Sequence, residues 1–222
     1  MKNLTLIIPA KNESESLPTV LTELGDFECK IIIVLDKNDI ETINSIKQTE
    51  NIKIIFQKSE GYGAALIDGI ECCETDLFCI FNADGSFNPN ELQNMYNKLR
   101  TVDFVFASRY QKNSGSEDDN LITLIGNYVF TKIGNIFFKL PITDILYTYV
   151  MGETKKAKSL GLVKKDFSYC VELPIKIKRN KMNLVSSPSY ERKRIAGKKK
   201  VNAFVDGFLI LKHMIKLFFT KL

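Results

Sequence analysis

Short apolar runs alternate with segments of helical spacing over the first 110 residues of the chain. The apolar runs are typical of strands that are covered on both faces, and they are LTLIIPA, KIIIVLD, IKIIFQ, DLFCIF and DFVFASRY. The intervening segments place apolar residues at helical intervals, and they are ESESLPTVLTEL, DIETINSIKQT, GYGAALIDGIECC and NPNELQNMYNKL. Strict alternation of buried strands and helices predicts an α/β fold with a mostly parallel sheet flanked by helices.

The apolar pattern becomes less regular after residue 110. A polar loop is expected at QKNSGSEDDN, helices at LITLIGNYVFTKIGNIFFKL and SYCVELPIKIKRN, and a strand running into a basic loop at LVSSPSYERKRIAGKKK. In NAFVDGFLILKHMIKLFFTKL, apolar residues recur at helical steps beside lysines; they are Phe204, Phe208, Leu211, Ile215, Phe218 and Leu222, next to Lys212, Lys216 and Lys221. This pattern predicts an amphipathic helix at a membrane interface, although a helix packed on the body explains it equally well. We expect one domain over 1–200 and this helix over 201–222.

Composition agrees with a soluble globular protein, because 45% of the 222 residues are hydrophobic and 26% are charged. The five cysteines form an odd set without Cys-x-x-Cys spacing, so neither a disulfide framework nor a zinc site is expected, and a reducing cytosol is the expected location. No signal segment is recognised at the start of the chain. Uninterrupted apolar runs are far shorter than a membrane span.

Positive charge is concentrated near the end of the chain. Residues 176–222 carry 13 Lys or Arg and two acids, a net +11, whereas residues 1–175 have a net charge of −6. Such a basic segment suits a polyanionic partner, which is a nucleic acid, an anionic membrane surface or a phosphate group, unless it is merely a solvated face. Nucleic acid is the weaker alternative, since the basic cluster has no interleaved stacking aromatics and no nucleic-acid motif is present.

Polar, charged or glycine residues follow every predicted strand. In parallel sheets these carboxyl ends meet at one edge, where ligands bind. The residues concerned are Pro9, Ala10, Asn12 and Glu13 after the first strand, Asp36 after the second, Lys58, Gly61 and Gly63 after the third, Asn82, Ala83 and Asp84 after the fourth, and Ser108 and Arg109 after the fifth. No Gly-x-Gly-x-x-Gly or Walker sequence is present, which disfavours a dehydrogenase or a P-loop enzyme. A carboxylate such as Asp36 suits a nucleoside base or ribose.

Several of these segments together resemble one known family. LTLIIPAKNESESLPTVL, IIIVLDKNDIET, GYGAALIDGI and FNADGSFNPNEL look like the glycosyltransferase family 2 domain, which has the nucleotide-sugar-binding GT-A fold. ASRY, IGNYVFTKIGNIFFKLPITD and RIAGKKKVNAFVDGFLIL resemble the branch of dolichol-phosphate mannosyltransferases and related polyprenyl-phosphate glycosyltransferases. The resemblance implies that the strand-exit residues from Pro9 to Asp84 bind a GDP- or UDP-linked sugar.

The resemblance also implies a divalent metal. Family members carry Asp-x-Asp where this chain has Asn82-Ala83-Asp84, so Asp84 is expected to bind Mg²⁺ or Mn²⁺ together with the diphosphate. Asn82 supplies only a neutral amide oxygen, and weaker metal affinity is expected; Ser86 is a further candidate ligand. As an alternative, Asp84 is an ordinary turn residue.

Acidic and basic residues are implied near the acceptor. Asp144 matches a family aspartate placed there, as a base or to orient the sugar, and Glu172 is a second acidic candidate. Alternatively, Asp144 caps a helix and Glu172 is an exposed helical residue. Arg194, Gly197 and Lys200 match a family Arg-x-x-Gly-x-Ser-Lys segment, in which Lys199 takes the serine position. With Ser108 and Arg109 they are expected to bind phosphates.

These residues favour a phosphate acceptor over a hydroxyl. A lipid monophosphate is largely ionised at neutral pH and needs cationic positioning more than a base. The expected activity is inverting transfer of a monosaccharide to a polyprenyl phosphate by a cytoplasmic protein bound peripherally to the inner membrane face. The alternatives are a family 2 enzyme that acts on a hydroxyl of a cell-surface glycan or lipid, and a non-catalytic nucleotide-sugar-binding protein.

Overall fold

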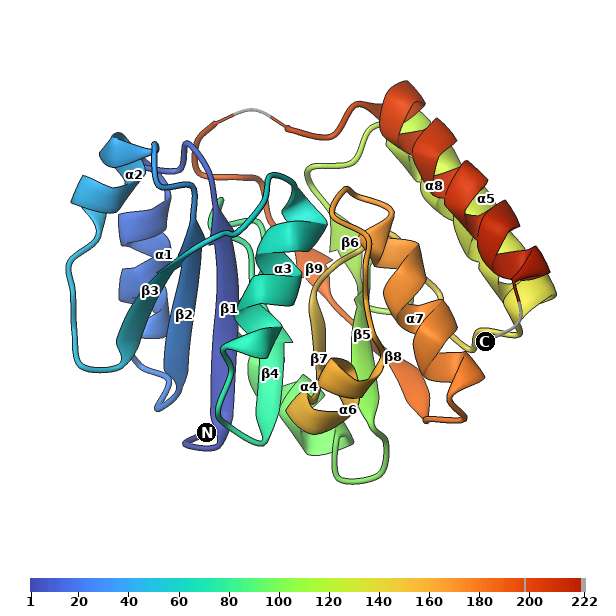
Figure 1. The fold of residues 1–222 in the computed structure, drawn as a ribbon, viewed down its shortest axis with the longest axis horizontal. Helices are drawn as coiled ribbons and strands as arrows, with labels where there is room; N and C mark the ends of the chain where they lie inside the picture. The colour runs from blue at the N-terminus through green and yellow to red at the C-terminus, as the bar shows by residue number, and fades with distance from the viewer. Residues whose placement is uncertain (198, 221–222) are drawn as a thin grey trace.

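The computed structural model describes residues 1–197 and 199–220, and its main element is a sheet of seven strands (Figure 1). The strands are β1 (Leu4–Ala10), β2 (Lys30–Leu35), β3 (Ile52–Phe56), β4 (Leu77–Ile80), β5 (Phe104–Ser108), β7 (Val150–Glu153) and β8 (Leu184–Pro188). Their order is β3-β2-β1-β4-β7-β5-β8, and β7 runs antiparallel between its neighbours while the other pairs are parallel. The predicted mostly parallel sheet is confirmed; β7 was not predicted.

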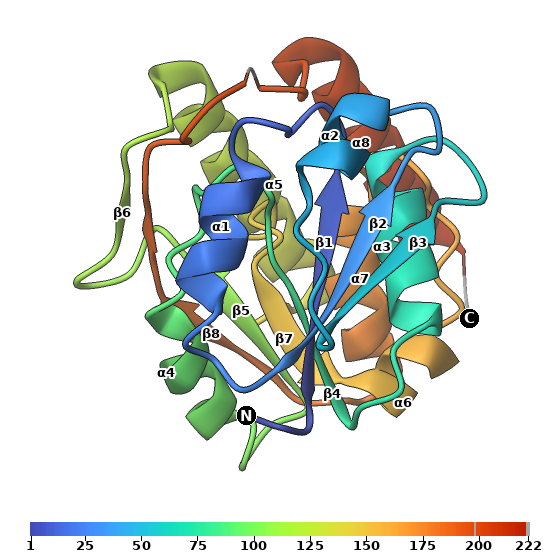
Figure 2. The ribbon, with the colours of Figure 1, turned by 90° about the vertical axis from the view of Figure 1, so that its left-hand side faces the viewer.

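Helices cover both faces of this sheet. The helices α1 (Leu17–Leu24), α2 (Ile40–Ser45) and α4 (Glu91–Lys98) pack on one face, and α3 (Tyr62–Glu71), α6 (Thr154–Ser159) and α7 (Tyr169–Arg179) pack on the other. Figure 2 shows α1 and α4 on the opposite side of the sheet from α3 and α6. Within β1, Leu6 and Ile8 pack on the face covered by α1, α2 and α4, while Ile7 packs on the face covered by α3, α6 and α7. Successive strand residues point to opposite faces of a sheet. This two-sided burial explains the continuous apolar runs.

Two long helices, α5 (Leu121–Phe138) and α8 (Ala203–Phe219), lie side by side at one edge of the body (Figure 1). The ring of Phe218 packs edge-on against Phe137 at 5.6 Å. Buried Ile210, Met214 and Leu217 attach α8 to the core. Both helices nevertheless expose large apolar side chains, including Leu121, Ile122, Ile125, Tyr128, Ile136 and Phe137 on α5 and Phe204, Val205, Phe208, Ile215, Phe218 and Phe219 on α8. The predicted Lys221 and Leu222 of the last helix lie outside the described residues.

Helix α5 is longer than the uninterrupted apolar runs in the sequence, which are too short to span a membrane. Among the described residues it is the one helix whose length and apolar composition would allow it to cross a bilayer, with 18 residues, a mean hydropathy of 1.3 and 17% burial. Length and composition are the only grounds for this statement, and core helices of soluble proteins meet the same criteria.

Two short strands and one segment complete the fold. The strand β6 (Gly115–Ser116) pairs in parallel with β9 (Tyr190–Glu191), so the loop after β5 is joined to the chain that follows β8. From β9 the chain crosses above the carboxyl ends of the main strands before it enters α8 (Figure 1). We call residues 192–197 and 199–200 of this crossing the basic loop. It places arginine and lysine side chains over the edge of the sheet where a ligand site is expected.

Candidate active site

A cavity of about 830 Å³ lies between the carboxyl ends of the strands and the helix pair α5–α8. Its polar wall contains Pro9, Ala10, Asn12, Glu13, Gly61, Tyr62, Asn82, Ala83, Asp84, Ser86, Arg109, Asp118, Asp119, Thr148, Glu191, Arg194, Lys199 and Lys200. Apolar side chains also line it, and they are Ile122, Ile125, Phe130, Leu146, Phe167, Phe204 and Ile210. Most strand-exit residues singled out in the sequence therefore meet in one cavity, because parallel strands end at the same edge.

The loop after β4 presents Asp84 to this cavity. Ser86 donates to Asp84 Oδ1 through its backbone N–H (3.0 Å) and its hydroxyl (2.7 Å), which leaves Oδ2 facing Arg194 Nη1 at 3.5 Å. The turn requires glycine at position 85, because its φ is +80°. A Cβ added there would also lie only 2.5 Å from Cδ1 of Ile195. Ser86 is buried and fixes the Asp84 carboxylate, so the geometry gives it a positioning role rather than that of a metal ligand.

The loop after β1 is held in place by a residue that sequence reasoning missed. Asp39, the N-cap of α2, accepts a hydrogen bond of 2.6 Å from the backbone N–H of Asn12, whose φ is +53°. Burial acts to raise the pKa of Asp39, but the hydrogen bonds from Asn12 and Thr42 outweigh it and the pKa is lowered. Glu13 accepts a hydrogen bond of 2.7 Å from the Ser16 hydroxyl and pairs with Lys200. The loop is thereby a rigid wall of the cavity.

Arg109 is a buried cation at the end of β5. Its guanidinium donates to both oxygens of Asp144 at 2.7 and 3.1 Å and also reaches Glu191 at 3.2 Å and Asp119 at 3.4 Å. It also stacks over the Tyr147 ring at 4.5 Å. The single positive charge of Arg109 is shared by three carboxylates and cannot neutralise all of them. Burial raises the pKa of Glu191 more than Arg109 lowers it.

The expectation that Asp144 acts as a base beside the sugar does not agree with this geometry. Asp144 is completely buried, it does not line the cavity, and both of its oxygens accept from Arg109. No helix follows it to be capped. We therefore assign Asp144 to positioning Arg109, which itself lines the cavity.

Glu172 is also placed away from the cavity. Its side chain is fully buried inside α7, where it accepts from the backbone N–H groups of Val163 (3.0 Å) and Lys164 (2.8 Å) and pairs with Lys176 at 3.0 Å. Both the catalytic role and the alternative of an exposed helical residue are therefore wrong. The carboxylate anchors the loop before α7 through these two hydrogen bonds, which also provide partners for a carboxylate that is itself fully buried.

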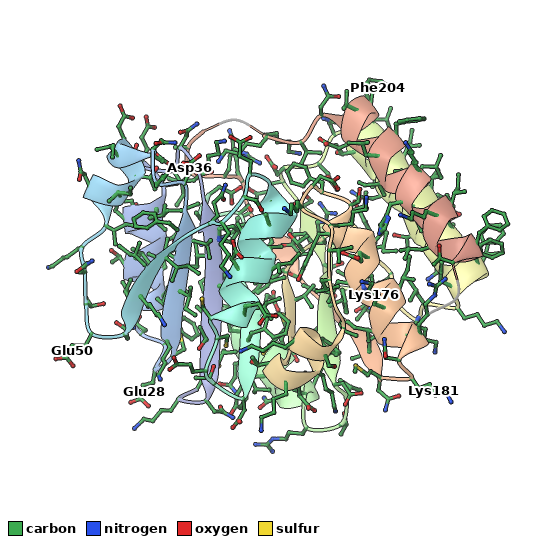
Figure 3. All side chains as sticks on the ribbon, viewed as in Figure 1. Glu28, Asp36, Glu50, Lys176, Lys181 and Phe204 are labelled. Atoms are coloured by element: carbon green, nitrogen blue, oxygen red, sulfur yellow. The ribbon has the colours of Figure 1, made fainter. Side chains whose placement is uncertain are left out.

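Five further predicted residues do not line the cavity. They are Asp36, Lys58, Gly63, Ser108 and Gly197. Asp36, labelled in Figure 3 above β2, accepts from the backbone N–H of Asn38 and so closes its own turn. The carboxylate of Asp68 binds Lys58 through its backbone N–H (2.7 Å). Gly63 allows α3 to touch the Lys164 carbonyl, and Ser108 is buried under Thr143. Gly197 belongs to the basic loop and has a φ of +78°, which glycine adopts readily.

The basic loop is fixed to the cavity wall by acidic partners. Arg194 donates to Asp118 at 3.0 Å, Lys199 Nζ lies 3.1 Å from Asp118, and Lys200 pairs with Glu13. The backbone N–H of Ile195 also donates to the Asp84 carbonyl at 2.8 Å. Asp118, Asp119 and Glu191 were missed as site residues. The only signal was the acidic run Glu117-Asp118-Asp119 in a predicted polar loop, and nothing local indicates that this loop faces Arg194.

The donor set suits a divalent cation only together with a ligand's phosphates. No group of three or more His, Cys, Asp or Glu side chains suited to a metal occurs in residues 1–197 and 199–220. Asp84 Oδ2 faces the cavity, and the Asn82 amide oxygen lies nearby, accepting from the Tyr62 hydroxyl at 3.2 Å. Mg²⁺ is commonly held by one or two carboxylates plus substrate phosphates, and this pair fits that pattern.

A mostly parallel sheet with carboxylate, amide and guanidinium groups gathered beyond its strand ends defines an α/β protein with a polar cavity at the usual ligand-binding edge. The sequence model described as "Glycosyl transferase family 2" matches residues 5–161. The chain belongs to this family, as the resemblance implied.

Similar proteins of known name include two glycosyltransferases and one glycosyltransferase of known structure. The chain is 25% identical over 214 residues to undecaprenyl-phosphate mannosyltransferase of Micrococcus luteus, covering 90% of this chain and 88% of that protein. It is 24% identical over 212 residues to UDP-N-acetylglucosamine–dolichyl-phosphate N-acetylglucosaminyltransferase of Methanococcus voltae, covering 84% of each. Glucosyl-3-phosphoglycerate synthase of Mycobacterium tuberculosis, solved with Mn²⁺, UDP-glucose and phosphoglyceric acid, superposes with a TM-score of 0.71 at 12% identity, covering 98% of this chain and 80% of that one. At that identity the likeness shows the fold alone, which is the GT-A fold.

Proposed function

We propose that this protein is an inverting glycosyltransferase that moves a monosaccharide from a nucleoside-diphosphate sugar to a polyprenyl phosphate at the cytoplasmic membrane face. The observation that carries the proposal is a cavity lined both by the charged side chains of Asp84, Arg109 and Arg194 and by apolar side chains of α5 and α8. A lipid phosphate needs both kinds of wall, whereas a water-soluble acceptor needs only the first. Two relatives are named for transfer to undecaprenyl or dolichyl phosphate.

The chain's own residues have distinct tasks in this proposal. The loops after β1 and β4 hold the donor, with Asp84 and Asn82 facing its diphosphate. When a divalent metal is bound there, it neutralises charge on the leaving nucleoside diphosphate. Arg109, fixed by Asp144, together with the basic loop holds and orients the acceptor phosphate. The phosphate oxygen attacks the anomeric carbon from the side opposite the leaving group. No base is required, because a phosphate monoester is already ionised at neutral pH.

A hydroxyl acceptor is the second candidate, and one observation favours it. Glu191 lines the cavity, and burial raises its pKa, which is the direction that suits a general base. The two candidates differ in the acceptor alone, so a direct assay separates them.

The test is a panel of UDP- and GDP-linked sugars, incubated with the full chain and Mn²⁺ in the presence of polyprenyl phosphate, a polyprenyl alcohol or phosphoglycerate. Products are analysed by mass. We expect a polyprenyl-phosphate monosaccharide from one donor and no product from the alcohol. Transfer to a hydroxyl acceptor alone would establish the second candidate, and absence of transfer and hydrolysis with any metal would favour a non-catalytic sugar-nucleotide-binding protein.

We further propose that α5 and α8 lie on an anionic membrane surface. Their exposed apolar side chains are accompanied by lysines, and burying each such side chain in lipid stabilises binding by about 1.5–3 kcal/mol. Replacing Phe208 and Ile215 together by Glu is expected to reduce co-sedimentation with phosphatidylglycerol vesicles at least about tenfold.

Ile40→Glu is the matched control for vesicle binding. Ile40 is similarly exposed, but it lies on α2, at the opposite end of the body from α8 (Figure 1). Its vesicle binding is expected to equal that of the unsubstituted protein. Equal loss in the control, or unchanged binding by the double variant, would place the membrane contact elsewhere.

The neutral Asn82 predicts weak metal affinity that a single substitution should improve. Asn82→Asp adds a second carboxylate beside Asp84 and is expected to tighten Mn²⁺ binding in the presence of UDP by about tenfold, as charge attraction in a partly buried site is strong. Titration followed by electron paramagnetic resonance measures this. Without metal, the added repulsion should lower the melting temperature. Unchanged Mn²⁺ affinity would show that residue 82 does not face the ion.

A further inference from the structure

Asp118 lies between two of the basic-loop cations that line the cavity, Arg194 and Lys199. Its Oδ2 accepts from Arg194 Nη2 at 3.0 Å and lies 3.1 Å from Lys199 Nζ, while Oδ1 lies 3.5 Å from Arg194 Nε. The Asp118 carbonyl also accepts from Lys199. This arrangement, one anion accepting from a guanidinium and an ammonium, is also the way in which proteins hold a phosphate.

The backbone of Asp118 is also held in place, by a residue of its own loop. The backbone N–H of Asp118 donates to the Ser116 hydroxyl at 3.1 Å, and Ser116 belongs to β6, which pairs with β9 just before the basic loop. Burial acts to raise the pKa of Asp118, but hydrogen bonds from Arg194 and Lys199 outweigh it, and the pKa is lowered. Asp118 is therefore an ionised group at neutral pH, prepositioned across the cavity from Asp84 on the other side of Arg194.

Two anions cannot occupy the same position between Arg194 and Lys199. All three side chains line the cavity, and the side chain of Asp118 is 15% exposed, so the position opens to a ligand. A phosphate that binds these cations must take the place of the carboxylate, and its apparent affinity is lowered by the fraction of molecules in which Asp118 is bound.

We propose that Asp118 is an internal substitute for a ligand phosphate: it holds the basic loop over the cavity, and the phosphate of donor or acceptor displaces it on binding. The inference rests on the proposed function, since it takes the basic loop to be a phosphate-binding segment. Asp118 then sets the affinity of the site for phosphate, and Asp118 and Glu13 hold the basic loop in place over the cavity through their ion pairs. The released carboxylate remains beside Asp119 and opposes retention of the ligand by charge repulsion.

Asp118→Asn is the test, with inorganic pyrophosphate and UDP as probes and calorimetry of the full chain as the measurement. Removing the competing charge is expected to tighten pyrophosphate binding by about three- to tenfold, the range set by a partly exposed ion pair. Glu117→Gln is the control, because it removes the same charge one residue away and leaves the carboxylate between Arg194 and Lys199. Its affinity should change much less, and Asp118→Glu should resemble the unsubstituted protein.

Trypsin digestion gives a second measurement, since the basic loop is rich in cleavage sites. Without ligand, the loop of Asp118→Asn should be cut faster than that of the unsubstituted protein, and pyrophosphate should restore protection in the variant. In the unsubstituted protein pyrophosphate should change little, as one anion replaces another.

The outcomes separate the two proposals. If both proteins bind pyrophosphate with equal affinity, or if the variant binds it more weakly, Asp118 is a structural partner only and the inference is overturned while the proposed function stands. If neither protein binds pyrophosphate or UDP, the proposed function itself fails, and the inference fails with it.

Discussion

Asp84→Asn is expected to lower kcat/KM for sugar transfer by about 10²–10³, the usual loss when one preorganised electrostatic contact to developing charge is removed. Asp84 is the one carboxylate at the exit of β4, and its Oδ2 faces the cavity while Oδ1 is held by Ser86. The amide keeps the shape and the hydrogen bonds from Ser86 but loses the negative charge. The loss should therefore appear in activity and in Mn²⁺ binding, with little change in the melting temperature.

Glu28→Gln is the control for this loss. It removes the same charge from an exposed side chain at the opposite end of the strands, as Figure 3 shows, where it pairs with Lys2 at 3.9 Å. Its kinetics are expected to match those of the unsubstituted protein. A fully active Asp84→Asn protein would contradict the assignment of the donor diphosphate to this edge of the sheet.

Arg109→Met is expected to destabilise the fold by about 3–5 kcal/mol, the range observed when one partner of a buried ion pair is removed. The substitution fills the space but leaves three carboxylates, Asp119, Asp144 and Glu191, close together without their shared cation. Urea unfolding measures the free-energy change. Lys156→Met, which breaks a half-exposed pair with Asp103 at the other end of β5, should cost no more than about 1 kcal/mol.

The stability deficit of Arg109→Met should depend on pH, with a definite sign. In the unsubstituted protein the pKa of Glu191 is raised by burial, so its contribution to stability is present below the ordinary value of 4.5 and is lost as pH rises through the raised value. In Arg109→Met the guanidinium that lowers the pKa of Glu191 is absent, so ionisation of Glu191 becomes more costly. The deficit should be smaller near about pH 5 than near about pH 8. A deficit independent of pH would show that packing over Tyr147, rather than charge, is what Arg109 contributes.

Much of the polar wall of the cavity followed from local sequence. The sequence predicts that Pro9, Asn12, Asn82 and Asp84 lie together, and all four line the cavity, because strand–helix alternation implies parallel strands and parallel strands end at one edge. The same reasoning failed for Asp36 and Lys58, which also follow strands. The Asp36 side chain accepts from its own turn, and the Lys58 ammonium pairs with Asp68 on α3 at 3.7 Å. The direction of a side chain at a strand exit depends on local backbone rotation that the apolar pattern does not specify.

The acidic residues were the least predictable part of the site. Asp144 and Glu172 were chosen as candidate catalytic acids, yet each is buried against a specific partner, Arg109 or the backbone before α7. The acids that do line the cavity, Asp118, Asp119 and Glu191, come from a polar loop and from the short strand β9. The antiparallel strand β7 was also missed, since a strand of four residues carries little periodic signal and α6 begins directly after it.

The amino-acid sequence by itself determined the α/β alternation, the family, the clustered positive charge and the two apolar helices, since each depends on composition or on spacing within one segment. Only the tertiary structure decided which charged groups share the cavity, that Arg109 is held by Asp144, and that Asp118 lies between Arg194 and Lys199. The Arg109–Asp144 pair and the pairs of Asp118 with Arg194 and Lys199 join residues between 35 and 81 positions apart. The sheet order and the β6–β9 bridge that bring them together are properties of the whole chain.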